Sequence, residues 1–384
     1  MIPLTVPELR GNEWKYIKEC LDTNWVSSAG RFVDRFEASL AEYIGIRHAV
    51  ATVNGTAALH MALLVAGIEP DDEVLVPSLT FIAPANAVRY VGAWPVFMDV
   101  EPTYWQMDSQ KVLDFLEGEC QWRDGGLYNK ATDRRVKAAL PVHILGHPVD
   151  MDPLMEVARK YGLVIIEDAT ESLGAKYKGR MVGSMGEMAC FSFNGNKIIT
   201  TGGGGMVATN REEWAQKIRY YTTQAKDDPQ EYVHREIGYN YRLTNIQAAL
   251  GCAQLEQLND YIAQKRQIAD AYSAQLKEVP GIQPMLEAPW ADSIFWLFTV
   301  LVDESQYGMD SRSLMRQLEQ EKIQARPLWQ PLHLSPAHKQ SMAYRISVAE
   351  EIHRKALSLP CSVGVGMDDI RRVAETVIKI AEPK

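Results

Sequence analysis

The most constraining feature of this sequence is an alternation between short apolar runs and amphipathic stretches across residues 48–210. Such alternation is expected when the strands of a parallel sheet are joined by crossover helices. The predicted helices lie at residues 56–66, 82–91 and 151–161, the last one directly after Asp150, a residue type that caps helices. The predicted strands lie at residues 48–53, 73–76, 96–98, 138–144, 163–167, 190–193 and 206–209. The pattern therefore predicts an α/β fold with a mostly parallel mixed sheet flanked by helices.

The rest of the chain indicates a second, smaller lobe. A long helix is predicted from Thr244 past Leu258, because good helix formers fill this stretch and no proline follows before Pro280. We place the lobe boundary inside this helix, which gives a large domain of residues 1–255 and a smaller α+β C-terminal domain of residues 256–384. A surface hairpin or loop is predicted at 118–137, a late strand at 295–302, and late helices at 312–321, 348–357 and 368–380.

The composition limits the kinds of partner. A formal net charge of −9 disfavours nucleic acid and anionic membranes, because those surfaces require clustered Lys and Arg. The five cysteines are scattered and include no C-x-x-C pair, which is typical of reduced thiols rather than of disulfides or a metal site. The N-terminus has no basic leader, and no apolar run approaches the roughly 20 residues that span a bilayer. We therefore expect a cytoplasmic protein with no nucleic-acid or membrane partner.

A candidate anion site lies at Asn54-Gly55-Thr56, where a predicted strand runs into a predicted helix. The first backbone N–H groups of a helix have no partner inside the helix, and they attract a phosphate. The same three residues also make an ordinary turn followed by a helix cap. Both interpretations stay open on this motif alone.

A candidate carboxylate is Asp168, which ends the apolar run Leu-Val-Ile-Ile-Glu-Asp. In an open α/β sheet the ligand lies beyond the carboxyl ends of the strands, which is where this residue falls. A buried carboxylate there could pair with a protonated heteroaromatic nitrogen. The alternative is an aspartate that caps the next helix or faces solvent.

A candidate nucleophile is Lys197, in the segment Phe-Ser-Phe-Asn-Gly-Asn-Lys that precedes four glycines at 202–205. A lysine near a cationic cofactor would lose its proton easily and become a nucleophilic amine. Taken alone, it could equally be a surface lysine before a flexible turn, because lysine is mostly exposed. The conjunction of a phosphate site, an acid and an amine favours a role in chemistry.

These residues belong to five motifs that resemble, in order, the DegT-type sugar aminotransferases, which are fold type I pyridoxal-phosphate enzymes of the aspartate aminotransferase superfamily. The resemblance begins at the Trp-Val-Ser-Ser-Ala-Gly loop of residues 25–30 and covers nearly the whole chain. The motifs lie at residues 54–59, 77–83, 167–175, 191–197 and 238–251. The resemblance implies an enzyme with an aspartate-aminotransferase-like fold that uses pyridoxal 5'-phosphate and L-glutamate to aminate a nucleotide-linked keto-sugar.

The resemblance also implies a role for individual residues. Lys197 matches the Schiff-base lysine, Asp168 the partner of the pyridine nitrogen, and Phe81 the aromatic that stacks on the ring. Asn240 matches a residue that reaches the phosphate from the neighbouring subunit, so the resemblance implies a homodimer with shared active sites. The phosphate cradle is matched by Gly55, Thr56 and Ser192.

One position departs from the pattern, because many relatives have Gln where this chain has Glu171. This position lies near the phenolic oxygen of the cofactor in the family, and an anionic carboxylate would repel that oxygen. Glu171 is therefore expected to be protonated, turned away or paired with a basic group. Lys197 favours transamination, because some relatives that act as dehydratases have His at that position.

The identity of the acceptor is predicted from two segments, residues 104–107 and the run that contains Lys197. Both look most like the branch that acts on a UDP-linked 2-acetamido-2,6-dideoxy-4-keto-hexose, with an 8-keto-octulosonate as the alternative acceptor. The sequence also leaves open a sugar dehydratase and a non-catalytic regulator. Residues Arg326, Trp329 and His333 match a segment near the substrate, although a structural loop would account for them as well. No metal is expected: His143 and His147 have helical spacing in a proline-rich turn.

Overall fold

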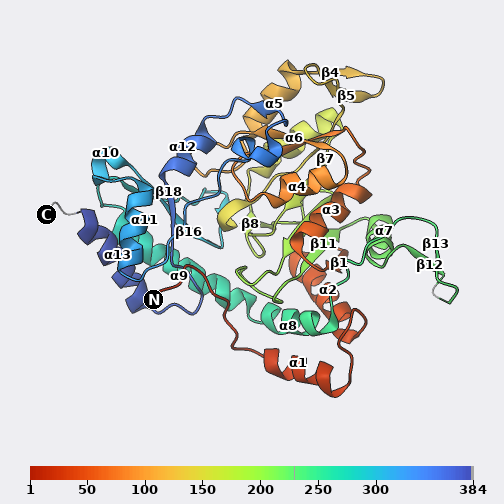
Figure 1. The fold of residues 1–384 in the computed structure, drawn as a ribbon, viewed down its shortest axis with the longest axis horizontal. Helices are drawn as coiled ribbons and strands as arrows, with labels where there is room; N and C mark the ends of the chain where they lie inside the picture. The colour runs from red at the N-terminus through yellow and green to blue at the C-terminus, as the bar shows by residue number, and fades with distance from the viewer. Residues whose placement is uncertain (229, 382–384) are drawn as a thin grey trace.

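The computed structural model describes residues 1–228 and 230–381, and its centre is an eight-stranded sheet (Figure 1). All neighbouring strands in this sheet are parallel except β11, which is antiparallel to both of its neighbours. The order of strands is β1 (His48–Thr52), β11 (Gly205–Thr209), β10 (Met188–Ser192), β7 (Val164–Asp168), β6 (Val136–Ala139), β2 (Glu73–Pro77), β3 (Trp94–Met98) and β17 (Ala343–Tyr344). The predicted mostly parallel mixed sheet is confirmed.

Helices in the first two thirds of the chain surround this sheet. Their ends follow local rules: Asn54 accepts the backbone N–H of Ala57 at the start of α3, and Gly45 ends α2 in the left-handed conformation. At the start of α8, Thr244 and Gln247 form a reciprocal capping box. The helices are α1 (Glu13–Asp22), α2 (Arg31–Ile44), α3 (Gly55–Val65), α4 (Ala83–Tyr90), α5 (Ser109–Gly118), α6 (Met151–Tyr161), α7 (Glu212–Thr222) and α8 (Asn245–Leu255).

The last third of the chain builds a second group of elements, on the left in Figure 1, around a three-stranded antiparallel sheet in the order β14-β16-β18. The strands are β14 (Ile282–Pro284), β16 (Phe298–Val302) and β18 (Ala356–Leu359). The helices are α9 (Leu258–Leu276), α10 (Glu304–Tyr307), α11 (Ser311–Gln320), α12 (Val348–Lys355) and α13 (Met367–Ala381). The division into residues 1–255 and 256–384 stays a prediction, and it falls between α8 and α9.

Short elements complete the chain. The predicted surface hairpin is present as β4 (Cys120–Arg123) and β5 (Gly126–Asn129), and a second hairpin, β12 (Lys226–Asp228) with β13 (Val233–His234), projects at the right of Figure 1. A small sheet joins β8 (Lys176–Tyr177), β9 (Arg180–Met181) and β15 (Ala291–Asp292), and single turns of 3₁₀ helix lie at Ile144–Gly146, Leu332–Leu334 and Pro336–His338. Across residues 1–228 and 230–381, no helix has the length and apolar character needed to cross a membrane.

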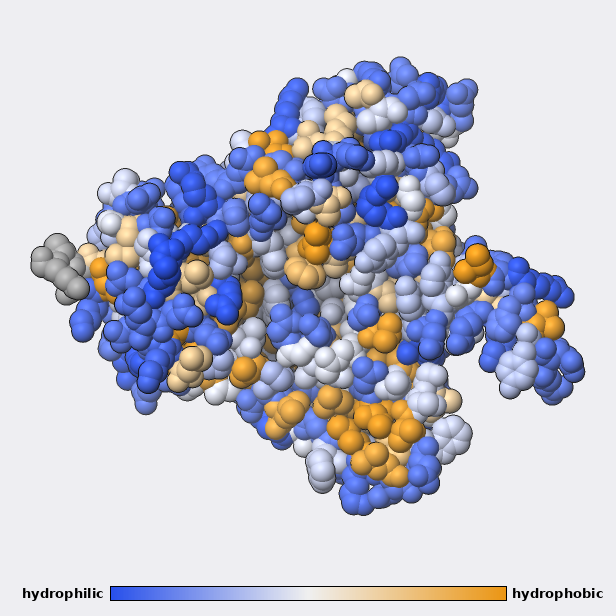
Figure 2. Space-filling view, in the orientation of Figure 1, coloured by the Kyte–Doolittle hydropathy of each residue, from blue (hydrophilic) through white to orange (hydrophobic). Residues whose placement is uncertain are grey.

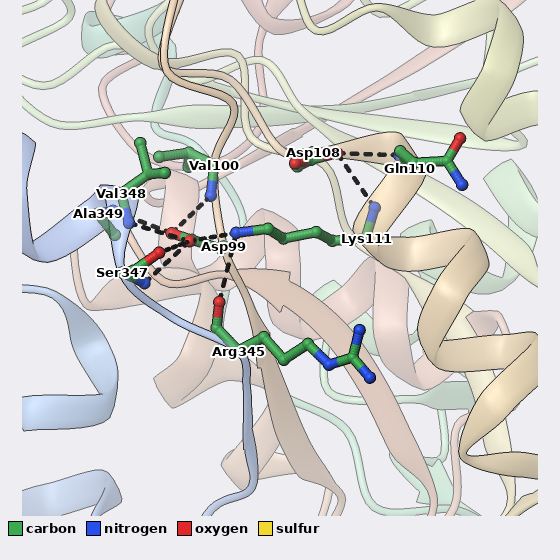
Figure 3. Close-up of polar contacts among 9 residues, drawn as sticks. All are labelled: Asp99, Val100, Asp108, Gln110, Lys111, Arg345, Ser347, Val348 and Ala349. Carbon is green, nitrogen blue, oxygen red and sulfur yellow. Dashed lines mark hydrogen bonds and ion pairs between the residues drawn. The ribbon is translucent and has the colours of Figure 1, made fainter.

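Asp99 connects the late part of the chain to the large sheet (Figure 3). Its buried carboxylate follows β3 and accepts hydrogen bonds from Lys111 Nζ at 2.6 Å and from the first backbone N–H groups of α12 at 2.9–3.0 Å. Burial alone would raise the pKa of Asp99, but these donors outweigh burial and lower it. Beside Asp99, β17 adds a parallel strand to β3. The carboxylate thus fixes α12 against the sheet.

Several predicted boundaries are wrong. The strand predicted at 295–302 begins only at Phe298, because Phe295 has a left-handed backbone with φ of 46°. The long helix from Thr244 divides into α8 and α9 at a turn at residues 256–257, where Glu256 accepts hydrogen bonds from three side chains of the N-terminal region. The predicted strand at 138–144 ends at Ala139, two residues before Pro141, which has no N–H to donate. The helix predicted at 348–357 ends at Lys355, because the buried residues that follow form β18.

Candidate active site

A cavity of about 370 Å³ lies beyond the carboxyl ends of β7 and β10 and beside the N-terminus of α3. This is the place where open α/β sheets bind ligands. The late part of the chain adds two tryptophans to its wall. The cavity is lined by Asn54, Gly55, Thr56, Leu59, Thr80, Phe81, Ala83, Pro84, Asp168, Thr170, Glu171, Ser192, Asn194, Asn196, Lys197, Trp296 and Trp329.

The end of the cavity at α3 has the features of an anion site. Gly55 and Thr56 are the first residues of the helix, so their backbone N–H groups have no partner within it. A Cβ atom on Gly55 would lie 2.8 Å from Cβ and 3.1 Å from Oγ of Ser192. Glycine therefore allows the helix start and the Ser192 hydroxyl to approach each other. Together they form a cradle of donors for a phosphate.

Asp168 ends β7 inside the cavity and is only 2% exposed. Its backbone N–H donates to Pro141 O at 2.9 Å, and its Oδ1 accepts the backbone N–H of Thr170 at 3.0 Å. Burial raises the pKa of the Asp168 carboxyl, and the hydrogen bonds from Thr170 oppose this effect. Because burial disfavours the ionised carboxylate, a cationic partner such as a protonated ring nitrogen would stabilise it.

Lys197 extends into the same cavity, with 13% of its side chain exposed. Its Nζ lies 3.7 Å from Oε1 of Glu171 and 4.2 Å from the centre of the Trp296 ring. Glu171 is buried, and its Oε2 accepts the backbone N–H of Leu145 at 2.9 Å. Burial raises the pKa of Glu171 to about 7, although Lys197 lowers it. The unusual glutamate is therefore paired with a basic group, one of the three states expected for it.

The structure brings most of the predicted site residues together. Phe81 lines the cavity with 54% of its surface exposed, and Trp329 lines it from the C-terminal part of the chain. Asn240 is exposed and lies outside the lining of the cavity in its own chain, where it would be available to a neighbouring subunit. The proposed roles of these residues stay predictions.

Two predicted substrate residues lie elsewhere in this structure. Arg326 lines a separate small cavity, and its Nη1 donates to Ala325 O at 2.9 Å. Both ring nitrogens of His333 have protein partners, Nδ1 with Ser78 Oγ at 2.7 Å and Nε2 with Glu350 Oε1 at 3.0 Å. Neither residue is brought into the lining of the cavity.

The histidines with helical spacing have protein partners as well. His143 Nε2 lies 3.2 Å from Glu167 Oε2, and its Nδ1 accepts the backbone N–H of Val149. His147 Nε2 accepts the backbone N–H of Ala288 at 3.0 Å. These contacts hold the turn after β6. The same turn contains Leu145, whose backbone N–H donates to Glu171.

The residue that sequence reasoning missed is Trp296. It falls inside a stretch predicted as a strand, where an aromatic residue is ordinary, and the contact with Lys197 joins positions far apart in the chain. Thr170 was missed as well, although its place directly after the Asp168 strand was a usable signal.

This fold and site define the class of fold type I pyridoxal-phosphate-dependent aminotransferases. The solved structure of S. venezuelae DesV in complex with ketimine intermediate is 34% identical, with a TM-score of 0.86, and covers 97% of this chain and 95% of its own. The sequence profile of the DegT/DnrJ/EryC1/StrS aminotransferase family matches residues 7–378, and the chain belongs to this family.

Two curated relatives share a product in their names. GDP-perosamine synthase of Caulobacter vibrioides is 40% identical over 97% of this chain and 96% of its own. GDP-perosamine synthase of Escherichia coli O157:H7 is 36% identical over 98% of this chain and 97% of its own. The predicted fold, family, cofactor and enzyme class are confirmed: the chain is a pyridoxal-phosphate-dependent sugar aminotransferase of nucleotide-sugar metabolism.

The residues of the cavity fit this cofactor. A Cβ atom on Gly55 would collide with Ser192, so glycine keeps the first N–H groups of α3 beside the Ser192 hydroxyl, where both can donate to a phosphate. Asp168 supplies a carboxylate for a ring nitrogen, and Lys197 supplies an amine for an aldehyde. Phosphate, ring and aldehyde thus each have a matching group in one cavity.

Proposed function

We propose that the protein transfers the amino group of L-glutamate to a nucleotide-linked keto-sugar in the cavity around Lys197. The observation that carries this proposal is the position of the Lys197 amine, in one cavity with the buried Asp168 carboxylate and the anion cradle at Gly55. The three groups come from helix α3, the end of β7 and the loop after β10, and packing of a core alone would not require them to converge.

Each group has a distinct task in this proposal. Lys197 binds the aldehyde of the cofactor and, when free, moves a proton between the cofactor and the reacting carbon of the donor or the sugar. Asp168 keeps the ring nitrogen protonated. Pyridoxal phosphate supplies an electron sink when bound, and a well-placed stabilising charge of this kind contributes about 3 kcal/mol or more. Gly55, Thr56 and Ser192 hold the phosphate, and Phe81 covers the ring.

The acceptor that we favour is a GDP-linked keto-sugar. Two relatives that match this chain over 97% and 98% of its length are named GDP-perosamine synthase. A UDP-linked 2-acetamido-2,6-dideoxy-4-keto-hexose is the second candidate, because the segments at 104–107 and 191–197 resemble the branch that uses it. In either case the amino-sugar would serve a surface glycan such as lipopolysaccharide.

A direct test offers each acceptor to the purified enzyme with isotopically labelled glutamate. We expect the labelled amino group on the GDP-linked sugar by mass spectrometry, with release of an equal amount of 2-oxoglutarate. Labelled product from the UDP-linked sugar or from 8-keto-octulosonate alone would replace the favoured acceptor. A dehydrated sugar without the label would indicate a dehydratase, and no 2-oxoglutarate with any acceptor would indicate a non-catalytic regulator.

We also propose that the active unit is a homodimer. Exposed apolar side chains at Leu21, Trp25 and Val26 lie on and after α1, and Figure 2 shows an apolar patch over α1 and α8. Such a patch is typical of a surface that another subunit covers. Mixing inactive variants Lys197→Ala and Asn240→Ala should restore activity if each site uses residues of both chains.

We further propose that the protein is located in the cytoplasm. The five free cysteines, all buried, support this location.

A further inference from the structure

Trp296 contacts the segment that carries Lys197 in two places. The Nζ atom of Lys197 lies 4.2 Å from the centre of the indole ring. The indole Nε1–H donates a hydrogen bond of 2.8 Å to the carbonyl of Asn196, the residue directly before Lys197. One side chain therefore holds both the backbone beside Lys197 and the end of its side chain.

The backbone of Trp296 is itself held from two sides. Its carbonyl accepts a hydrogen bond of 2.7 Å from Lys265 Nζ, a buried ammonium on α9 that also donates to the carbonyl of Cys361. On the other side, a Cβ atom on Gly146 would lie only 2.6 Å from the backbone nitrogen of Trp296. Ile294 N–H donates to Gly146 O at 3.0 Å beside this contact. The indole is thus a rigid wall of the cavity.

A buried tryptophan is most often part of a core, and Trp296 is only 4% exposed. A buried indole N–H needs a hydrogen-bond partner in any core, but packing alone requires no amine above the ring. Here the ring face lies toward an ammonium whose other neighbour is Glu171 Oε1 at 3.7 Å. The negative face of an indole attracts such a cation. The amine therefore lies between a carboxylate and an aromatic face.

We propose that Trp296 is a positioning residue that holds the ε-amine of Lys197 where it can attack the aldehyde of pyridoxal phosphate. This inference rests on the proposed role of Lys197. In the step concerned, the ammonium first gives one proton to Glu171 or to solvent. The neutral amine nitrogen then forms a double bond to the aldehyde carbon, and the aldehyde oxygen leaves as water with the two remaining amine protons. The rate of such a step depends strongly on the starting geometry of the two atoms.

The experiment compares cofactor-free wild-type enzyme with Trp296→Leu and Trp296→Phe. The first readout is the rate at which visible absorbance develops on mixing with pyridoxal phosphate. The second is the affinity for pyridoxamine phosphate, which has an amine in place of the aldehyde and cannot form a covalent bond to Lys197.

We expect Trp296→Leu to slow the attachment of pyridoxal phosphate about tenfold or more and to leave the affinity for pyridoxamine phosphate unchanged. Trp296→Phe keeps a ring face and loses the hydrogen bond to Asn196, so its attachment of pyridoxal phosphate should be slowed less than that of Trp296→Leu.

Trp290→Leu is the matched control, because it removes a part-buried tryptophan that lies outside the lining of the cavity. It should attach pyridoxal phosphate at the wild-type rate. Attachment at the wild-type rate in both Trp296 variants would overturn the inference, and so would an equal loss of rate and of affinity for pyridoxamine phosphate. If Trp296→Leu does not fold, Trp296→Phe alone decides by the same two readouts. A failure of the proposed function would be recognised by a different result. Wild-type enzyme reduced with borohydride would then have no pyridoxyl group on Lys197.

Discussion

Replacing Glu171 by Gln should make the cofactor-free protein more stable than wild type at alkaline pH. Burial raises the pKa of this carboxyl from 4.5 to about 7, so the folded state holds the proton more tightly than the unfolded state does. The cost of the ionised carboxylate therefore appears as the pH rises above 4.5 and is complete above about 7. At about 1.4 kcal/mol for each pKa unit, this cost is about 3 kcal/mol.

Glutamine removes the ionisation and keeps an oxygen that can accept the Leu145 N–H, which Glu171 accepts at 2.9 Å. Urea unfolding of both proteins at pH 5 and pH 8 measures the effect. The free energy of unfolding of Glu171→Gln relative to wild type should rise by about 2.5 kcal/mol from the lower to the higher pH, because a small part of the effect is already present at pH 5. Glu375→Gln, an exposed control on α13, should show no such change. An identical difference between Glu171→Gln and wild type at both pH values would refute the reasoning.

Three other substitutions test separate parts of the structure. Gly55→Ala should fill the cradle and weaken the binding of pyridoxal phosphate about tenfold or more, as measured by titration. In Gly118→Ala the added Cβ atom meets no atom within 4 Å, so this control should bind the cofactor as tightly as wild type. Asp168→Asn should lower the rate of transamination about a hundredfold or more with the cofactor still bound, because a neutral amide does not keep the ring nitrogen protonated; a wild-type rate would contradict its role. Asp99→Ala should lower the free energy of unfolding by about 3–5 kcal/mol, because it leaves Lys111 without its buried partner, and a loss below about 1 kcal/mol in urea would show that α12 is held by other contacts.

The large sheet was predictable because local rules and tertiary packing agree there. Strands such as β2 (Glu73–Pro77) are buried along their whole length and read as continuous apolar runs in the sequence. Asn54 predicted the start of α3 by the same local chemistry that the structure shows. The errors in the predicted boundaries lie where contacts between residues far apart in the sequence are made. One error is the break after α8, where Glu256 contacts N-terminal residues that helix propensity does not describe.

The candidate site divides in a similar way. Asp168 could be identified because it ends an apolar strand, and Lys197 because its motif occurs together with the other motifs of the family. Trp296 could not, because its contact with Lys197 depends on how the late part of the chain packs against the sheet. His333 shows the reverse case: its motif suggested a ligand contact, but both ring nitrogens are occupied by Ser78 and Glu350 in this structure.

The most direct test of the proposed function is to locate the covalent attachment of the cofactor. The enzyme is saturated with pyridoxal phosphate, reduced with borohydride, digested and analysed by mass spectrometry. The pyridoxyl group should appear on the peptide that contains Lys197, and Lys197→Ala should lose it. A pyridoxyl group on another lysine, or none on fully loaded wild-type enzyme, would contradict the proposal.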